Sequence, residues 1–220
     1  MAPGSFPFSG QHSPSAVDSA AVEFLVGAAI LVVSYLIGSV DFAVLVGRMH
    51  GVDIHQVGSG NPGTSNVMRT LGRGPAVMVF IGDTLKGVIA AALGTFLSGD
   101  GAASAWAFGA GLMAVLGHCY PLFHRFRGGK GVATGGGVLL FAVPIVGLIL
   151  SLLWVTVAKL GKVASIASLI VVAASIPLLI WQGVEGWALF WFGMMLGLVI
   201  YRHRGNISRI MKRREPSVVR

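Results

Sequence analysis

The feature that most constrains this chain is a series of apolar runs, each long enough to cross a lipid bilayer as a helix. About 20 apolar residues suffice for such a helix. The runs cover residues 22–47, 74–97, 102–123, 132–158, 163–181 and 184–201. Charged residues make up 11% of the chain, against about 25% in soluble domains, and the mean hydropathy is +0.81. These values exclude a soluble globular domain and predict an all-α integral membrane protein.

The basic residues are distributed unevenly between these runs. Fifteen of the sixteen Lys and Arg residues fall in four clusters, at 48–73, 125–130, 159–162 and 202–220, and Lys86 is the exception. Short loops rich in Lys and Arg stay on the cytoplasmic side, so we expect all four clusters there. In a soluble protein a net charge of +8 would suggest nucleic acid. Here anionic headgroups account for it, so membrane lipid is expected as a partner and nucleic acid is not.

Six simple spans cannot place all four clusters on one side. The connections near Asp100 and Glu185 contain no Lys or Arg, as expected of external loops. Both observations fit if residues 132–158 enter the membrane and return, with Pro144 interrupting the helix. We therefore predict two short helices at about 132–143 and 145–158. The fold then has seven transmembrane or short re-entrant helices, with the N-terminus outside and the C-terminus cytoplasmic.

Three regions follow from this pattern. Residues 1–20 are rich in Pro, Ser and Gly and lack the basic start of a signal peptide, so we expect a disordered extension. Residues 21–205 form the multi-span helical domain, and residues 206–220 form a basic cytoplasmic tail. The single Cys119 allows no intrachain disulfide and offers no metal set. It is interpreted as a buried core thiol.

The first polar loop contains Ser59, Asn61, Asn66 and Arg69 among glycines. Small residues let a ligand approach the backbone closely, and the planar guanidinium of an arginine suits a phosphate group. A solvated Gly/Asn/Ser turn would have the same composition, so this loop alone leaves both interpretations open.

The second loop places Lys130 between Gly128, Gly129 and Gly131. Glycine N–H groups can point at one anion beneath the lysine ammonium, and a helix beginning at Val132 would direct its positive end there. The string is not a Walker A loop, because Gly131 stands where Ser or Thr is required. His118, nearby at the membrane end, is interpreted more simply as a core histidine.

The third cluster reads Arg202-His203-Arg204-Gly205-Asn206-Ile207-Ser208-Arg209. On a helix, His203 and Asn206 share a face, whereas Arg202 and Arg209 project elsewhere. The alternative is a juxtamembrane basic anchor, which does not explain the His and Asn.

Two polar pairs lie within the apolar runs. Asp83 and Lys86 stand at helical spacing and predict a structural ion pair. Ser165 and Ser168 share a helix face, where lone serines are typical of helix–helix contacts.

These motifs, in this order between membrane spans, resemble the bacterial acyl-phosphate:glycerol-3-phosphate acyltransferases, the PlsY family. The resemblance covers residues 36–209 and rests on the Gly58-Ser-Gly-Asn-Pro-Gly loop, the Gly-Gly-Lys-Gly loop and the Arg202-His-x-x-Asn206-x-x-Arg209 segment. It implies a seven-helix enzyme of the bacterial plasma membrane with a cytoplasmic active site. Such an enzyme transfers a fatty acyl group from acyl phosphate to the 1-hydroxyl of sn-glycerol 3-phosphate. The products are 1-acyl-sn-glycerol 3-phosphate and phosphate, at the first step of phospholipid synthesis.

The resemblance also implies which residues form the site. The expected catalytic residues are Ser59, Lys130, His203 and Asn206, and the expected substrate-binding residues are Asn61, Arg69, Gly128, Gly129, Gly131 and Ser168. Ser168 is included on the resemblance alone. The expected partners are glycerol 3-phosphate, fatty acyl phosphate and membrane lipid, with no metal and no cofactor. The oligomeric state is left open.

An acyl phosphate is already activated, so positioning and charge neutralisation suffice and no strong nucleophile is needed. Either His203 or a substrate phosphate oxygen could then accept the proton. A transporter of a small phosphorylated anion would use similar loops and a broken helix. It would need a site near the middle of the membrane, whereas the polar residues here cluster on one side. A CDP-alcohol phosphotransferase fits less well, because its repeated aspartates are missing.

Overall fold

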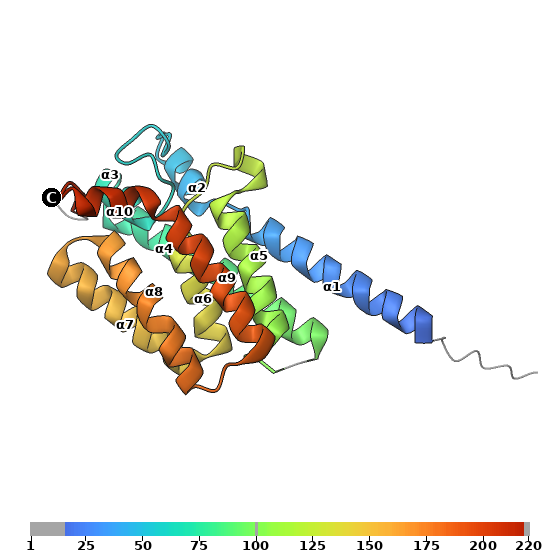
Figure 1. Ribbon diagram of the computed structural model, residues 1–220. Coiled ribbons are helices and arrows are strands. Elements are labelled where there is room, and N and C mark those ends of the chain that lie inside the picture. Colours follow the sequence, from blue (N-terminus) through green and yellow to red (C-terminus); the bar gives the residue numbers. More distant parts are fainter. Residues whose placement is uncertain (1–15, 100, 218–220) are drawn as a thin grey trace, which may run out of the picture.

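The computed structural model describes residues 16–99 and 101–217, and this part of the chain is helical and contains no strand (Figure 1). Residues 1–15 of the expected disordered extension lie outside the described residues, whereas residues 16–20 form the beginning of the first helix. The elements are α1 (Ala16–Gly38), α2 (Phe42–Met49), α3 (Thr64–Thr70), α4 (Arg73–Ser98), α5 (Ala105–Cys119), the 3-10 helix η1 (Leu122–His124), α6 (Val132–Ala142), α7 (Pro144–Gly161), α8 (Ala164–Trp181), α9 (Gly186–Arg202) and α10 (Arg204–Met211).

Five segments of the described residues are long and apolar enough to cross a membrane. They are Ala21–Met49, Arg73–Ser98, Ala105–His124, Pro144–Gly161 and Ala164–Trp181, and the apolar helices α6 and α9 are shorter. Large apolar side chains cover the outside of these helices; on α7, for example, Leu152 is 68% exposed. Exposed apolar surface of this extent is typical of a membrane protein, in which lipid covers it.

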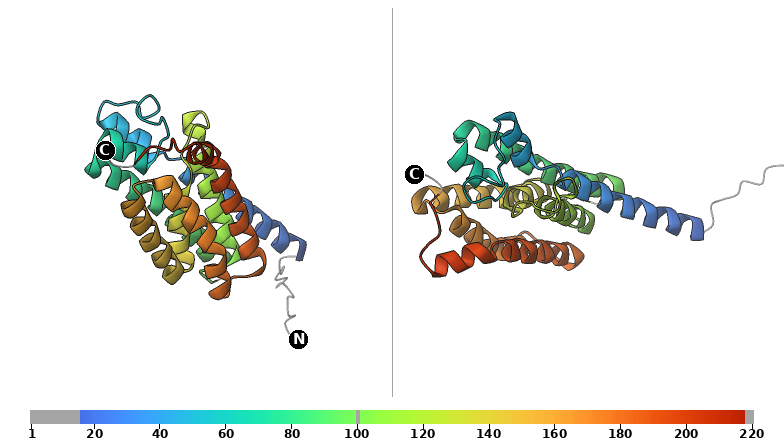
Figure 2. Two further views of the ribbon diagram at one scale, coloured as in Figure 1. Left: turned by 60° about the vertical axis from the view of Figure 1, so that its left-hand side comes forward. Right: turned by 90° about the horizontal axis from the view of Figure 1, so that it is seen from above.

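The first apolar run, expected over residues 22–47, is one candidate span at Ala21–Met49, and it is made of two helices. α1 ends at Gly38 and α2 begins at Phe42. The buried carboxylate of Asp41 accepts a hydrogen bond from Val44 N at 3.0 Å and caps α2. In the same break, Lys86 Nζ donates to Val40 O at 2.9 Å. The beginning of α1 extends away from the other helices (Figures 1 and 2).

The break expected near Pro144 is confirmed. α6 ends at Ala142 and α7 begins at Pro144, where a proline fits because the first residue of a helix needs no N–H partner. α7 packs against both α6 and α8. Its last residues lead to Lys162, whose carbonyl accepts a hydrogen bond from Ser217 Oγ of the C-terminal segment at 3.1 Å. α6 and α7 together therefore return the chain to the end at which α10 lies. The expectation that both helices are short is wrong for α7, which is long enough to cross a membrane.

All four basic clusters meet at this end of the molecule (Figure 1). The Arg202 guanidinium donates to Gly128 O, and Arg69 donates to Ser217 O. Together with the Lys162 contact, these bonds connect the loop around α3, the loop before α6, the α7–α8 turn and the C-terminal segment. We call this the polar end of the helices.

Small residues bring the helices close enough to support that end. A Cβ added at Gly87 of α4 would lie 2.0 Å from Thr134 O of α6, and one at Gly137 of α6 would lie 2.0 Å from Thr84 O of α4. Backbone contact through small residues is how helices pack tightly in membranes. Elsewhere in the core, Phe108 of α5 meets Phe192 of α9 edge to face at 5.7 Å.

Candidate active site

The first polar loop is organised by Asn66, the buried asparagine of α3. Its Oδ1 accepts a hydrogen bond from Ser59 N at 2.8 Å, and its Nδ2 donates to Val57 O at 3.1 Å and Ile54 O at 3.3 Å. Gly58 adopts φ +61° beside this amide, where a Cβ would lie 2.3 Å from Asn66 Oδ1. The side chain of Asn66 is therefore used to shape the loop that presents Ser59.

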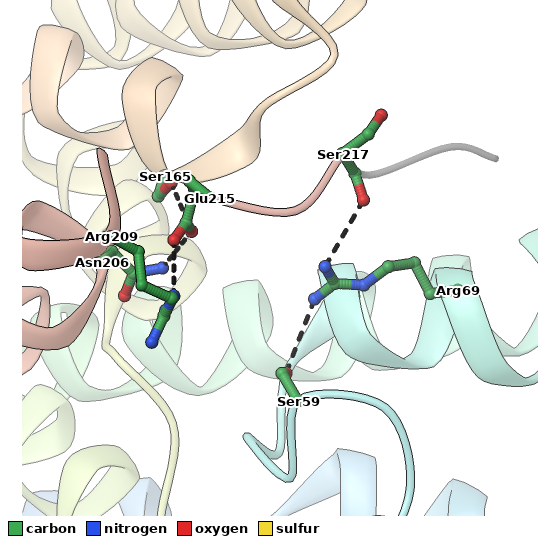
Figure 3. Close-up of polar contacts among 7 residues, drawn as sticks. All are labelled: Ser59, Arg69, Ser165, Asn206, Arg209, Glu215 and Ser217. Atoms are coloured by element: carbon green, nitrogen blue, oxygen red, sulfur yellow. Dashed lines mark hydrogen bonds and ion pairs between the residues drawn. The ribbon is translucent and has the colours of Figure 1, made fainter. Parts of the chain in front are cut away.

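Arg69, one helical turn after Asn66, reaches across the loop toward the C-terminal segment. Its Nη2 donates to Ser59 Oγ at 3.5 Å and its Nη1 donates to Ser217 O at 3.4 Å (Figure 3). Among the residues that the structure describes, the buried Nε of Arg69 has no hydrogen-bond partner. Buried donors are normally bonded, so this unpaired atom is a place for a ligand oxygen.

The glycine-rich loop before α6 is held by its neighbours. Arg202 donates from Nη2 to Gly128 O at 2.7 Å and from Nε to Gly129 O at 3.0 Å, and its guanidinium lies 4.9 Å from the centre of the Tyr120 ring. A Cβ at Gly129 would lie 2.7 Å from Pro62 O. The loop therefore packs directly against the first polar loop, in which Asn61 lies half-buried before Pro62.

The glycines do not all serve as the anion cradle predicted from the sequence. Gly129 N donates to His118 O at 3.0 Å, so its N–H is not available to a ligand. A Cβ at Gly128 would lie 2.1 Å from the same carbonyl oxygen. Close packing requires these two glycines, whereas Gly131, at φ +85°, forms the N-terminal cap of α6. For Gly129 the predicted cradle is therefore wrong, because the turn uses its N–H internally.

Lys130 is half-buried within this loop. The pKa of Lys130 is lowered to about 8, chiefly by burial; the Glu215 carboxylate opposes this change, and the nearby cations Arg209, Arg69 and Arg202 add to it. No hydrogen bond or ion pair with another described residue holds its ammonium group. A cation gathered with other cations and left unpaired is suited to binding an anion.

His203 lies at the junction of α9 and α10 and is 2% exposed. Its Nδ1 donates to Val199 O at 2.8 Å, which assigns the proton to Nδ1 and leaves Nε2 as an acceptor. The pKa of His203 is lowered to about 4, chiefly by burial; the hydrogen bond to Val199 opposes this change and the charge of Lys130 adds to it. The side chain is therefore neutral at pH 7. The helix expected to run through this residue is interrupted here, because α9 ends at Arg202 and α10 begins at Arg204.

Asn206 and Arg209, one turn apart on α10, bind the same carboxylate. Asn206 Nδ2 donates to Glu215 Oε1, and Arg209 Nε donates to Glu215 Oε2 at 2.7 Å (Figure 3). Ser165 Oγ of α8 donates to Glu215 Oε1 at 2.8 Å. The expectation that Arg209 projects away from the site is wrong, because α10 turns it back onto Glu215.

Ser168 is placed differently from the other expected site residues. Its buried hydroxyl donates to Ala164 O at 2.8 Å and accepts from Trp154 Nε1 of α7 at 3.0 Å. These bonds tie α8 to α7, as expected of a lone serine in a membrane helix. Its contact with substrate stays a prediction, and Ser165 is the serine that reaches the polar cluster.

The ion pair predicted within α4 is confirmed. Lys86 Nζ is 2.9 Å from Asp83 Oδ1, and His118 Nδ1 is 3.4 Å from the same oxygen. The interpretation of His118 as a core residue is confirmed, since it is 7% exposed and Gly129 packs against its ring. Cys119 is a buried free thiol, as expected.

Ser165, Asn206 and Arg209 all donate to Glu215, and we call these four residues the polar cluster. Three of them were not predicted as site residues from the sequence: Ser165, Arg209 and Glu215. Ser165 and Arg209 belong to motifs identified in the sequence, whereas Glu215 had no signal because it lies in a basic tail. In the described part of the chain, no group of three or more His, Cys, Asp or Glu side chains could hold a metal ion.

The chain is similar to known acyltransferases over most of its length. Residues 28–213 match the family model described as glycerol-3-phosphate acyltransferase. A glycerol-3-phosphate acyltransferase of Bacillus cytotoxicus is 44% identical over 190 residues, which cover 85% of this chain and 92% of that relative. One from Rubrobacter xylanophilus is 40% identical over 194 residues, covering 83% of this chain and 90% of the relative.

Solved structures agree with these similarities. The crystal structure of PlsY (YgiH), an integral membrane glycerol 3-phosphate acyltransferase, in its glycerol 3-phosphate form has a TM-score of 0.82 and 38% identity, covering 87% of this chain and 94% of that one. Its lysophosphatidic acid form has a TM-score of 0.80, 37% identity and the same coverage. The family match, the identities and the shared helical fold all extend across the motif residues, and the chain therefore belongs to the PlsY family of glycerol-3-phosphate acyltransferases.

Proposed function

We propose that this protein transfers a fatty acyl group from acyl phosphate to the 1-hydroxyl of sn-glycerol 3-phosphate. The observation that carries the proposal is the meeting of cationic Lys130, Arg69 and Arg209 with the neutral, buried His203 at the polar end. Both substrates carry phosphate, and both can be bound by this arrangement. The apolar surface of the helices beside it can accept the acyl chain.

The bond changes follow from the chemistry of a mixed anhydride. The 1-hydroxyl oxygen attacks the acyl carbonyl carbon, the bond from that carbon to the bridging phosphate oxygen breaks, and phosphate leaves with the electron pair. Cations placed before the reaction stabilise the charge that develops on the leaving phosphate. Lys130 and the guanidinium groups of Arg69 and Arg209 would supply that stabilisation, and Ser59 and Asn61 lie in the loop beside Arg69.

His203 can orient the attacking hydroxyl, because its Nε2 is an acceptor directed by the bond from Nδ1 to Val199 O. Its pKa of about 4 makes it a weak base in the free protein. A phosphate oxygen, with a second pKa of about 6, competes better for the proton. We therefore assign positioning of the hydroxyl to His203 and proton acceptance to a phosphate oxygen.

The proposed topology has seven membrane or re-entrant segments, an external N-terminus and a cytoplasmic active site. The positive-inside rule applied to the four clusters at the polar end supports this orientation, as does the return of α7 to that end. Residues 21–205 then form the catalytic domain, and residues 206–220 form the cytoplasmic tail.

Acyl transfer by the purified protein tests the proposal. Radiolabelled palmitoyl phosphate and glycerol 3-phosphate, given to the protein in lipid nanodiscs, should yield labelled lysophosphatidic acid and one phosphate per product. Acyl-coenzyme A in place of acyl phosphate should yield none. If sealed proteoliposomes accumulate unmodified glycerol 3-phosphate and no acyl product forms, the protein is a transporter and the proposal is wrong.

A further inference from the structure

A second group of cations lies at the polar end, apart from the candidate active site. Arg48 lies in the last turn of α2, and Arg125 and Arg127 follow η1 (Figure 1). All three line one open cavity of about 580 Å³, to which neither Arg69 nor Lys130 contributes. Cavities that bind small ligands have volumes of about 300–1,000 Å³. This cavity is therefore large enough for a ligand of its own.

The charges of this cavity are not balanced within the protein. Among the residues that the structure describes, its three guanidinium groups form no hydrogen bond and no ion pair. Asp53 is the only carboxylate that these residues contribute to the lining, and it is bonded within its own turn. Its Oδ1 accepts from His55 N at 3.0 Å, and its Oδ2 accepts from Gln56 Nε2 at 2.8 Å. Three cations and one anion leave an excess of positive charge, which suits an anionic ligand.

The turn that carries two of these arginines is held by its own backbone. Arg125 and Phe126 both adopt the left-handed conformation, at φ +54° and +59°, which is uncommon for residues other than glycine. Phe126 N donates to Pro121 O at 3.0 Å, and Arg127 N donates to His124 O at 3.1 Å. The guanidinium groups do not take part in these bonds. The turn is therefore formed without them, and they stay available to a ligand.

The position of the cavity relative to the membrane indicates which anion it meets. Two candidate membrane spans end beside it, one at Met49 and one at His124. The arginines therefore lie where apolar helices end, which is the level of the lipid headgroups. Phe123, which lines the cavity, and Phe126 are 60% and 55% exposed. An ion dissolved in water would gain little from these rings, whereas a lipid can cover them.

We propose that this cavity binds the headgroup of an anionic phospholipid, such as phosphatidylglycerol. Its phosphate is bound by Arg48, Arg125 and Arg127, because a planar guanidinium matches phosphate oxygens in pairs. Its acyl chains lie against the exposed rings and the apolar helices beside them. The lipid is held as a ligand and does not react, so this site is additional to the proposed acyl transfer.

The wall of the cavity is continuous with the loop that presents Ser59. Ile54 lines the cavity, and its carbonyl oxygen accepts from Asn66 Nδ2 at 3.3 Å. A Cβ at Gly60 would lie 2.9 Å from the carbonyl oxygen of His55, another residue of the lining. A ligand that binds only the folded protein stabilises it. We therefore expect the bound lipid to raise the melting temperature of the protein.

Lipid binding by the purified, delipidated protein in detergent tests the proposal. Native mass spectrometry gives the Kd of phosphatidylglycerol and of zwitterionic phosphatidylcholine, and thermal unfolding gives the stability with each lipid. Competition with inorganic phosphate separates a lipid site from a site for a soluble anion. The test variant replaces the three arginines of the cavity by Gln. The matched control loses the same charge at exposed positions outside the cavity, through Arg73→Gln, Lys159→Gln and Arg213→Gln.

The wild-type protein should bind phosphatidylglycerol at least about tenfold more tightly than phosphatidylcholine, since one basic residue beside an anionic surface contributes about fivefold in affinity. The cavity variant should lose this preference and the rise in melting temperature, and the control should keep both. Equal weakening in the control, or displacement of the lipid by inorganic phosphate, would overturn the inference. If the cavity variant does not fold, the wild-type protein still decides, because equal binding of the two lipids contradicts the proposal. Acyl transfer is not measured, so failure of the proposed function leaves this result unaffected.

Discussion

Burial gives the two titratable groups of the site opposite tasks. It lowers the pKa of Lys130 to about 8 and that of His203 to about 4. Burial always disfavours the charged form, but the two side chains start from different ordinary values. At pH 7 the lysine is still mainly cationic and the histidine is neutral. The site can therefore pair a phosphate-binding cation with an uncharged acceptor for a hydroxyl.

The pH dependence of the reaction should report on Lys130. Because its pKa is lowered, its charge is present below about pH 8 and is lost at a lower pH than that of an ordinary lysine. We expect kcat/KM to fall as the pH rises through about 8, and Lys130→Arg to shift this decline to higher pH, because a guanidinium does not deprotonate. A rate constant independent of pH up to 10, or near-normal activity of Lys130→Ala, would contradict the assignment.

Asn206 distinguishes a substrate site from a basic anchor without any change of charge. Asn206→Ala should strongly reduce acyl transfer at normal membrane insertion, because its amide is a hydrogen-bond donor among the cations at the polar end. Combined with His203→Ala, the total loss should be smaller than the sum of the two single losses, since both residues serve one substrate. Initial rates of the purified variants measure this. Full activity of Asn206→Ala would return the segment to an anchoring role.

At the scale of elements, the two helix breaks differ in how visible they are in the sequence. Pro144 makes the break between α6 and α7 predictable from the sequence, because a proline interrupts a helix that would otherwise continue through it. The break between α1 and α2 carries no proline and lies within apolar sequence. It forms where Asp41 caps α2 and where Lys86 of α4 binds a freed carbonyl group. The break between α1 and α2 therefore involves a contact with another helix, and local hydropathy could not predict it.

The tight contact of α4 with α6 should be sensitive to one methyl group. Gly137→Ala places a Cβ 2.0 Å from Thr84 O, whereas a Cβ at the adjacent Gly136 has nothing within 4 Å. We expect Gly137→Ala to destabilise the protein by about 1–3 kcal/mol through overpacking, and Gly136→Ala to be neutral. Thermal unfolding in detergent compares the two. Equal melting temperatures would show that the helices separate without cost.

At the scale of the whole molecule, α7 returns the chain to the polar end and so brings the residues of the candidate site together there. Without the hairpin of α6 and α7, Lys162 and Ser165 would lie far from Arg69 and Lys130. The hairpin thus brings Ser165 of α8 to α10, where Glu215 is bound. The convergence of four loops at one end also distinguishes this arrangement from that of a transporter, which needs a site open to both sides.

Membrane topology can be tested with single cysteines after Cys119→Ser. Gly161, in the last turn of α7, and Gln182, after α8, are both exposed. Gly161→Cys should react with an impermeant maleimide only from the cytoplasmic side, and Gln182→Cys only from the outside. Right-side-out and inverted vesicles provide the two directions. Labelling of both cysteines from the same side would refute the proposed topology.

The sequence by itself determined the membrane class, most helix positions and the loops that carry the site, because transfer of a segment into lipid and the residue types of a loop are local properties. The tertiary structure decided which groups are used. In the folded chain the Gly129 N–H donates to His118 O, and Ser165 rather than Ser168 points toward α10. Glu215 lies between Asn206 and Arg209, which both donate to its carboxylate. Those choices depend on segments that are distant along the chain, so they follow from how the helices pack and from no local pattern.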